Sequence, residues 1–350
     1  MDPLKIDTVK LSDAGDALVI IDQTLLPNGV RYLSLTAIED IWEAIRALRV
    51  RGAPAIGVAA AFGAYLAAYY APDAELEGRF LAACDYLATS RPTAVNLFWA
   101  LDRMRAAYGR VKALPPADIR AALRAEAQAV MDEDVEISRS IGRYGLSLLR
   151  PGMGILTHCN AGTLATAKYG TALAPVYAAI ERGLPGLRVY CDETRPLLQG
   201  ARLSAFEMVS AGVDTTLLCD NMASSLMKSG KVDIIFVGCD RVARNGDAAN
   251  KIGTSGVAIL AAHYGIPFYV CAPSSTIDGA IASGEDIPIE FRPPEEVTEL
   301  WYEKRMAPEG VGVYNPAFDV ADAGLITGII TERGLVRAPF EEGFRALGLV

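Results

Sequence analysis

The sequence has few of the residues that bind metal ions, and positive charge is in the minority. It contains only two histidines among 350 residues, and its six cysteines form neither a CxxC pair nor a His/Cys ligand spacing. These features argue against a structural zinc site, and against a disulfide scaffold in a chain of this length. The formal net charge of -9 argues against a general nucleic-acid binder, which normally carries a basic face. A few local arginines can still bind an anion within an acidic protein.

The sequence also gives no indication of a membrane span, a signal sequence or a dinucleotide loop. The apolar stretch 53–70 contains glycines and falls short of a confident membrane span, and residues 1–5 do not resemble the start of a signal peptide. Gly152-Met153-Gly154 precedes a predicted strand instead of following one, so the GxGxxG loop of NAD-binding proteins is missing. We therefore expect a cytoplasmic protein that requires neither a metal nor a nicotinamide.

The N-terminal third predicts a small α+β domain. Residues 9–35 have the apolar runs and turn residues of an antiparallel β meander. Thr36 and Glu39 then predict a capping box at the start of an amphipathic helix. Two further apolar helices are expected to start near Pro54 and Pro92.

The remainder predicts a larger α/β domain. The segment Leu114-Pro115-Pro116 is typical of a boundary, so we place the two domains at 1–115 and 116–350. After a long helix at 117–148, strand, loop and helix patterns alternate, which predicts a parallel sheet covered by helices, a doubly wound α/β domain. The expected strands are 154–159, 187–191, 214–219, 232–239 and 267–271.

Polar residues follow several of these strands, at the edge where open α/β sheets bind ligands. Cys159 ends the first strand before a small-residue turn and a helix, whose N-terminus can lower the pKa of a thiol. Asp240 follows a strongly apolar strand, which predicts a partly desolvated carboxylate suited to proton transfer near neutral pH. The alternative is that cysteine is simply a small residue that suits a tight strand end.

Arginines stand before two of the N-terminal helices. Arg51-Gly52-Ala53-Pro54 and Arg91-Pro92-Thr93 each place an arginine at a helix start, where free backbone N–H groups and the helix dipole attract anions. Together they predict a phosphate clamp, and the alternative is two surface arginines at helix caps. Gln199 at a helix entrance and Lys251 after Asp240 add candidate ligand contacts.

A series of long motifs runs in order over nearly the whole chain. They occupy residues 22–27, 51–57, 91–96, 158–162, 192–205, 220–223, 246–253, 272–278 and 314–319. In these motifs the chain resembles the methylthioribose-1-phosphate isomerases, the aldose–ketose isomerases of methionine salvage. Their superfamily includes ribose-1,5-bisphosphate isomerases and the regulatory subunits of translation initiation factor 2B.

The resemblance implies a site as well as a function. It implies that Cys159 and Asp240 are the catalytic pair, in a Rossmann-like C-terminal domain of a homodimer that needs neither metal nor nucleotide. It also implies that a further set of residues binds the substrate, chiefly its phosphate: Arg51, Gly52, Ala53, Arg91, Gln199, Asn250 and Lys251.

The implied reaction converts 5-methylthioribose 1-phosphate to 5-methylthioribulose 1-phosphate. Because C1 is locked as a glycosyl phosphate, the ring must open before hydrogen moves from C2 to C1. Asp240 is the candidate acid at the ring oxygen, and Cys159 the candidate for the C2 proton or for stabilising the transition state. Proton transfer and hydride shift both remain open.

Three alternatives to this substrate and function stay open. They are an isomerase of 5-deoxyribose 1-phosphate, an isomerase of ribose 1,5-bisphosphate, and a non-catalytic regulatory protein of the initiation-factor type. Thr254-Ser255-Gly256 and Glu290-Phe291-Arg292 depart from the pattern expected for the family. These departures leave the preferred 5-substituent open, whereas the presence of Cys159 and Asp240 argues against the regulatory protein.

Overall fold

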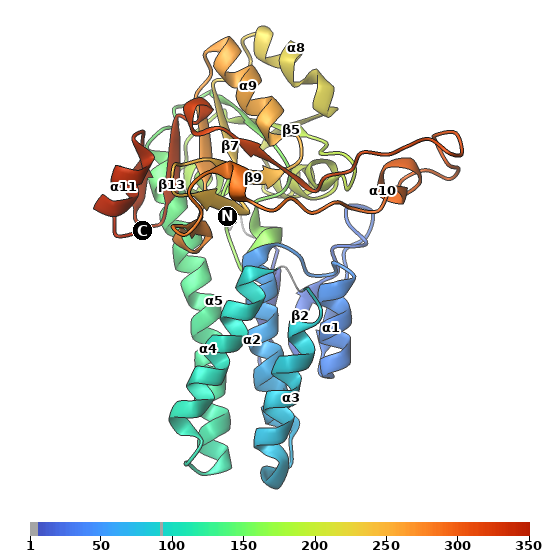
Figure 1. Ribbon diagram of the computed structural model, residues 1–350, viewed down its shortest axis with the longest axis vertical. Coiled ribbons are helices and arrows are strands. Elements are labelled where there is room, and N and C mark those ends of the chain that lie inside the picture. Colours follow the sequence, from blue (N-terminus) through green and yellow to red (C-terminus); the bar gives the residue numbers. More distant parts are fainter. Residues whose placement is uncertain (1–5, 92–93) are drawn as a thin grey trace. The chain divides into compact units, whose positions relative to one another are not determined.

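The computed structural model describes residues 6–91 and 94–350, which form two compact units (Figure 1). The helical unit takes the described residues up to Ser138 together with Gly162–Gly170, and the sheet unit takes Arg139–Ala161 and Thr171–Val350. The predicted boundary at residue 115 falls inside the helical unit. The long helix that begins there adds Ile119, Leu123 and neighbouring apolar side chains to the core of that unit.

The helical unit combines a small sheet with long helices. The predicted meander is present as the antiparallel strands β1 (Val9–Leu11), β2 (Leu18–Ile21) and β3 (Tyr32–Leu35). The sequence did not predict α3. The helices are α1 (Ile38–Arg46), α2 (Ala53–Tyr70), α3 (Leu76–Ala88), α4 (Val95–Val111) and α5 (Pro116–Leu146).

Helix α2 is the centre of the helical unit. It is long and apolar enough to cross a membrane, but 72% of it is buried inside the protein. It packs against α1, α3 and α4, and small residues let α4 approach closely: a Cβ on Gly57 would lie 2.9 Å from the carbonyl oxygen of Asn96. Its apolar character therefore fits a core helix.

The predicted capping box at Thr36 and Glu39 is wrong. Helix α1 takes Ala37 as its N-cap, without a side-chain hydrogen bond. Because the helix starts one residue later than predicted, Glu39 no longer stands three residues after the cap. Glu39 and Asp40 instead lie in the first turn, where their charge complements the helix dipole.

The sheet unit contains the predicted parallel sheet. Its seven strands lie in the order β14-β13-β10-β7-β4-β5-β6, and all neighbours pair in parallel except β13 and β14. The five predicted strands are confirmed, and the last two were not predicted. The strands are β4 (Gly154–Thr157), β5 (Arg188–Asp192), β6 (Asp214–Leu218), β7 (Ile234–Val237), β10 (Phe268–Cys271), β13 (Gly328–Thr331) and β14 (Gly334–Val336).

Helices and a second sheet surround these strands. The helices are α6 (Ala174–Glu181), α7 (Ala205–Ser210), α8 (Ala223–Lys228), α9 (Thr254–Tyr264), α10 (Glu295–Thr298) and α11 (Phe340–Ala346). The second sheet has the order β11-β8-β9-β12, and its strands are β8 (Arg241–Ala243), β9 (Ala248–Lys251), β11 (Ile277–Asp278) and β12 (Phe318–Ala321). Its first strand in the chain, β8, begins directly after Asp240.

Candidate active site

The strand order gives the large sheet one topological switch point. From β4 the chain moves through β5 to β6 on one side, and then returns to β7, β10 and β13 on the other. Ligands of open α/β sheets bind beyond the carboxyl ends of the strands at such a point. Cys159 follows β4 and Asp240 follows β7, the two strands that flank the switch. Both predicted catalytic residues therefore follow the carboxyl ends of neighbouring strands.

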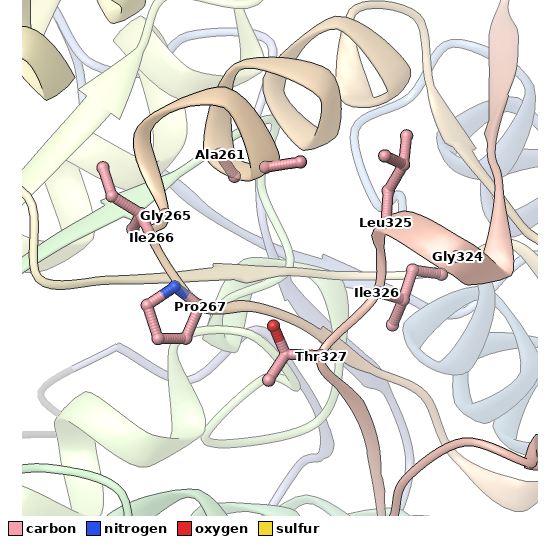
Figure 2. Close-up of a pocket in the computed structure, with 9 residues that line it drawn as sticks. Ala261, Gly265, Ile266, Pro267, Gly324, Leu325, Ile326 and Thr327 are labelled. Carbon is pink, nitrogen blue, oxygen red and sulfur yellow. The ribbon is translucent and has the colours of Figure 1, made fainter.

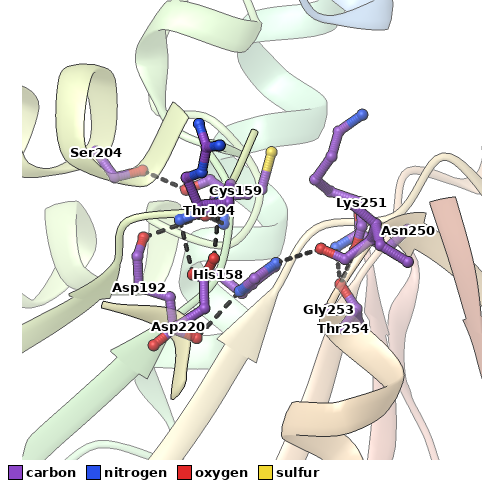
Figure 3. Close-up of polar contacts among 12 residues, drawn as sticks. His158, Cys159, Asp192, Thr194, Ser204, Asp220, Asn250, Lys251, Gly253 and Thr254 are labelled. Atoms are coloured by element: carbon purple, nitrogen blue, oxygen red, sulfur yellow. Dashed lines mark hydrogen bonds and ion pairs between the residues drawn. The ribbon is translucent and has the colours of Figure 1, made fainter. Parts of the chain in front are cut away.

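Cys159 has an unusual backbone. Its φ is +66°, in the left-handed region that non-glycine residues seldom adopt. Two buried hydroxyls hold its peptide groups: the backbone N–H of Cys159 donates to Oγ1 of Thr194 at 2.8 Å, and its carbonyl accepts from Oγ of Ser204 at 2.7 Å (Figure 3). Strained residues of this kind cluster at functional sites.

Next to Cys159, His158 lies buried and has both ring nitrogens engaged. Its Nε2 donates to the carbonyl of Ile252 at 2.8 Å, and its Nδ1 lies 3.0 Å from Oδ2 of Asp192 (Figure 3). Burial opposes the charge on His158, but the Asp192 carboxylate, the charge of Asp220 and the hydrogen bond to Ile252 outweigh it and raise the pKa of the imidazole. His158 thus ties the end of β4 to β5 and to the loop before α9.

Close packing around His158 requires a glycine on that loop. Gly253 has a φ of +102°, and a Cβ there would lie 2.8 Å from Cε1 of the His158 ring. Asp319 on β12 accepts hydrogen bonds from the backbone N–H groups of Gly253 and Ser255. The start of α9 is therefore fixed from two sides.

One group of side chains in residues 6–91 and 94–350 lies close enough to hold a metal ion: His158, Asp192 and Asp220. Both nitrogens of His158 already make hydrogen bonds. The carboxylate of Asp220 accepts the backbone N–H groups of Thr194 and Arg195, each at 2.7 Å. These contacts hold the strand ends and the loop after β5, while Oδ1 of Asp192 is buried without a hydrogen-bond partner among the described residues.

Asp240 differs from the sequence-based expectation in its environment. The side chain is exposed, whereas the apolar strand before it predicted partial desolvation. The reason is that β7 ends at Val237, so Gly238 and Cys239 carry the chain out of the sheet before Asp240. Its backbone N–H donates to the carbonyl of Ala249 at 3.0 Å, which ties Asp240 to β9.

The other predicted residues of the sheet unit are packed into its loops. Asn250 is buried and donates to Oγ1 of Thr254, while Nζ of Lys251 donates to the carbonyl of Ala317 and lies 4.3 Å from the ring centre of Phe318. Gln199 is buried just before a short π-helical turn, a feature frequent at functional sites. Its Oε1 has no hydrogen-bond partner within residues 6–91 and 94–350, and an unpaired buried acceptor is costly enough to suggest a ligand.

The remaining predicted residues belong to the helical unit. Gly52 has a φ of +89°, and a Cβ on it would lie 2.2 Å from the carbonyl oxygen of Ala165, so only glycine fits. Ala53 begins α2, with Pro54 in the first turn. Nε of Arg51 donates to Oε1 of Gln23 at 3.3 Å, an orienting contact that the sequence alone did not predict.

Arg91 is half-buried and precedes α4, which begins at Val95. Pro92 and Thr93, which the sequence analysis placed in the same motif, lie outside the described residues. The structure thus places Cys159, Asp240, Gln199, Asn250 and Lys251 in the sheet unit, and Arg51, Gly52, Ala53 and Arg91 in the helical unit.

A separate hollow in the sheet unit carries no comparable chemistry. It lies beside Pro267 and Thr327, which precede β10 and β13, and so at the amino ends of the strands (Figure 2). Small and apolar residues line most of it, and Oγ1 of Thr327 already accepts the backbone N–H of Phe268. The candidate active site is therefore at the opposite end of the sheet.

Comparison with known proteins identifies the family of this chain. The sequence profile of the Initiation factor 2 subunit family (IF-2B) matches residues 49–338, most of the chain. The chain belongs to this family.

Relatives within the family are similar over nearly their whole length. The chain is 66% identical over 348 residues to a methylthioribose-1-phosphate isomerase of Symbiobacterium thermophilum, covering 99% of this chain and 97% of the relative. It is 56% identical over 342 residues to a 5-deoxyribose 1-phosphate isomerase of Petrotoga mobilis, covering 97% and 98%. The crystal structure of 5-methylthioribose 1-phosphate isomerase from Pyrococcus horikoshii OT3 superposes with a TM-score of 0.94 at 44% identity, covering 99% and 97%.

Proposed function

We propose that this protein is an aldose–ketose isomerase that converts 5-methylthioribose 1-phosphate to 5-methylthioribulose 1-phosphate in methionine salvage. The observation that carries this proposal is the 66% identity, over nearly the whole chain, to a methylthioribose-1-phosphate isomerase. The positions of Cys159 and Asp240 after the two strands that flank the switch point support it.

The proposed chemistry moves hydrogen within one molecule. Asp240 donates a proton to the ring oxygen, and the bond between C1 and that oxygen breaks while the phosphate stays on C1. The hydrogen on C2 then ends on C1, and the C2 hydroxyl becomes a ketone as its proton is lost to solvent, from which Asp240 is protonated again. Cys159 either takes the C2 proton or stabilises a hydride shift beside it. Substrate and product have the same composition, so the reaction consumes no oxidant or reductant.

We further propose which residues hold the substrate. The unpaired Oε1 of Gln199 offers an acceptor for a sugar hydroxyl, and the ammonium of Lys251 offers a charge for the phosphate. Arg51, with Gly52 and Ala53 at the start of α2, and Arg91 before α4 supply charge and backbone N–H groups for an anion. Asn250 completes the set.

A second candidate substrate is 5-deoxyribose 1-phosphate. The specific observation in its favour is the 56% identity to a 5-deoxyribose 1-phosphate isomerase. The two sugars differ only in the thioether on C5, so the chemistry proposed for Cys159 and Asp240 is the same for both.

Side-by-side turnover of three sugar phosphates by the purified protein tests the proposal. We expect the highest kcat/KM for 5-methylthioribose 1-phosphate, lower values for 5-deoxyribose 1-phosphate, and little turnover of ribose 1,5-bisphosphate. A higher kcat/KM for the 5-deoxy sugar would replace the first substrate with the second. No turnover of any of the three would favour the non-catalytic regulatory alternative.

We also propose that the protein is a cytoplasmic homodimer. The six cysteines, all within the described residues, form no disulfide, as is usual in a reducing compartment. Size-exclusion chromatography with light scattering would measure the mass in solution. A monomer mass at working concentration would contradict the dimer.

A further inference from the structure

The loop after β5 contains a residue whose conformation is costly. Thr194 is fully buried and has a φ of +63°, which for a β-branched residue is a genuine outlier. The carboxylate of Asp220 on the next segment holds this conformation by accepting the backbone N–H groups of Thr194 and Arg195. Strain of this kind persists only where surrounding contacts over-determine it.

The hydroxyl of Thr194 has a defined orientation. Its single hydrogen is donated to the carbonyl of Asp192 at 3.1 Å, which leaves its lone pairs as acceptors. One of them accepts the backbone N–H of Cys159 at 2.8 Å (Figure 3). Thr194 thus joins the end of β5 to the residue that follows β4.

This contact acts on the strained peptide of the candidate catalytic residue. With a φ of +66°, Cys159 directs its Cα–Cβ bond differently from a residue that continues the extended strand. Releasing its N–H would let the backbone relax toward the extended region and turn the thiol away. The Cys159 N–H would also lose a partner in a buried place, which is unfavourable.

We propose that Thr194 is a positioning residue that sets the direction of the Cys159 thiol through its side-chain hydroxyl. Ser204 supports the same peptide from its other side, since its Oγ donates to the carbonyl of Cys159. The inference rests on the proposed function, in which the Cys159 thiol acts on the C2 hydrogen. It predicts that the hydroxyl of residue 194, and not the methyl group, matters for turnover.

The test compares Thr194→Val, which keeps the shape and removes the hydroxyl, with Thr194→Ser, which keeps the hydroxyl. Thr215→Val is a matched control, because Oγ1 of Thr215 also donates to the carbonyl two residues earlier, at 2.9 Å, but lies on β6 away from Cys159. Assays with 5-methylthioribose 1-phosphate would give kcat and KM separately. Site-resolved mass spectrometry after alkylation would give the reaction rate of the Cys159 thiol in each variant.

We expect Thr194→Val to lower kcat by about 10- to 100-fold, the loss typical of a misplaced catalytic group, with KM within about threefold. The alkylation rate of Cys159 should change in Thr194→Val but not in Thr215→Val. Thr194→Ser and Thr215→Val should stay within about threefold of the unmodified protein, as expected when no catalytic contact is lost. A normal kcat in Thr194→Val, or equal losses in the valine and serine variants, would overturn the inference.

Two further variants keep the test decisive. If Thr194→Val does not fold, Thr194→Ala removes the same hydroxyl with a smaller side chain, and an unchanged kcat in that variant would overturn the inference. Cys159→Ser separates this inference from the proposed function. Full turnover by Cys159→Ser would remove the catalytic role of the thiol and both proposals with it. An inactive Cys159→Ser beside a normal Thr194→Val would remove only the role of Thr194.

Discussion

At the scale of single residues, the two candidate catalytic groups are held in opposite ways. Cys159 is buried, and the hydroxyls of Ser204 and Thr194 form hydrogen bonds with its carbonyl and its backbone N–H, whereas Asp240 is exposed and its backbone N–H donates to the carbonyl of Ala249. A rigid thiol and an accessible carboxylate suit different tasks. In the proposed reaction the thiol acts at one carbon atom, and the exposed carboxylate can exchange its proton with solvent between turnovers.

Asp240→Asn is expected to abolish most turnover while leaving the fold intact. The amide is nearly isosteric and replaces an exposed side chain, so stability should change by less than about 0.5 kcal/mol. Turnover should fall by about 10²–10⁴-fold, because the amide cannot donate the proton for ring opening. Thermal melting and kcat, measured on the same preparation, test both parts. Near-normal kcat in Asp240→Asn would falsify its catalytic role.

Gly52→Ala should destabilise the helical unit strongly. The added Cβ would lie 2.2 Å from the carbonyl oxygen of Ala165, and the φ of +89° disfavours any side chain. We expect a loss of at least about 2 kcal/mol, measured by urea unfolding. Gly256→Ala is the control, since a Cβ at this position inside α9 meets nothing within 4 Å. That variant should gain about 0.5–1 kcal/mol from helix propensity. Similar effects of the two substitutions would contradict the packing argument.

At the scale of elements, the sequence predicts the long and strongly patterned segments best. Five of the parallel strands and α2 follow from their apolar runs, whereas β8, β9, β11 and β12 are short and each includes a charged residue instead of continuing an apolar run. Cys159 and Asp240 could be proposed from the sequence because each closely follows an apolar strand. Thr194 and Ser204 could not, since their role depends on contacts with Cys159 that only the folded loops create.

The arginines before α2 and α4 are predicted from the sequence to bind the phosphate of the substrate. Arg51→Ala and Arg91→Ala should each weaken binding of substrate or product by about ten- to a hundredfold, because a charge-assisted hydrogen bond to phosphate contributes roughly 1.5–3 kcal/mol. Calorimetric titration measures the affinity. Arg79→Ala is a suitable control, since its ion pair with Glu75 lies on the exposed surface of α3. Unchanged affinity in both Arg51→Ala and Arg91→Ala would rule out a phosphate clamp.

At the scale of the whole molecule, charge and composition fit a small anionic substrate better than a macromolecular one. The net charge of -9 leaves the protein without the excess of basic residues that nucleic-acid binders use. The candidate substrate residues instead add a few local cations, Arg51, Arg91 and Lys251, to an acidic chain. A bound sugar phosphate would therefore interact with these local positive charges, and the negative net charge of the protein does not exclude its binding.

The last prediction concerns metal independence, and it also applies to the whole molecule. The one group in residues 6–91 and 94–350 that is close enough to hold a metal is His158, Asp192 and Asp220. Binding a metal there would break a hydrogen bond of His158 and disturb the loop that holds Cys159. Activity should therefore persist, within about twofold, after exhaustive chelation and desalting, because the proposed acid–base chemistry uses side chains alone. Complete loss of turnover that a divalent cation restores, but that monovalent salt at equal ionic strength does not, would contradict this mechanism.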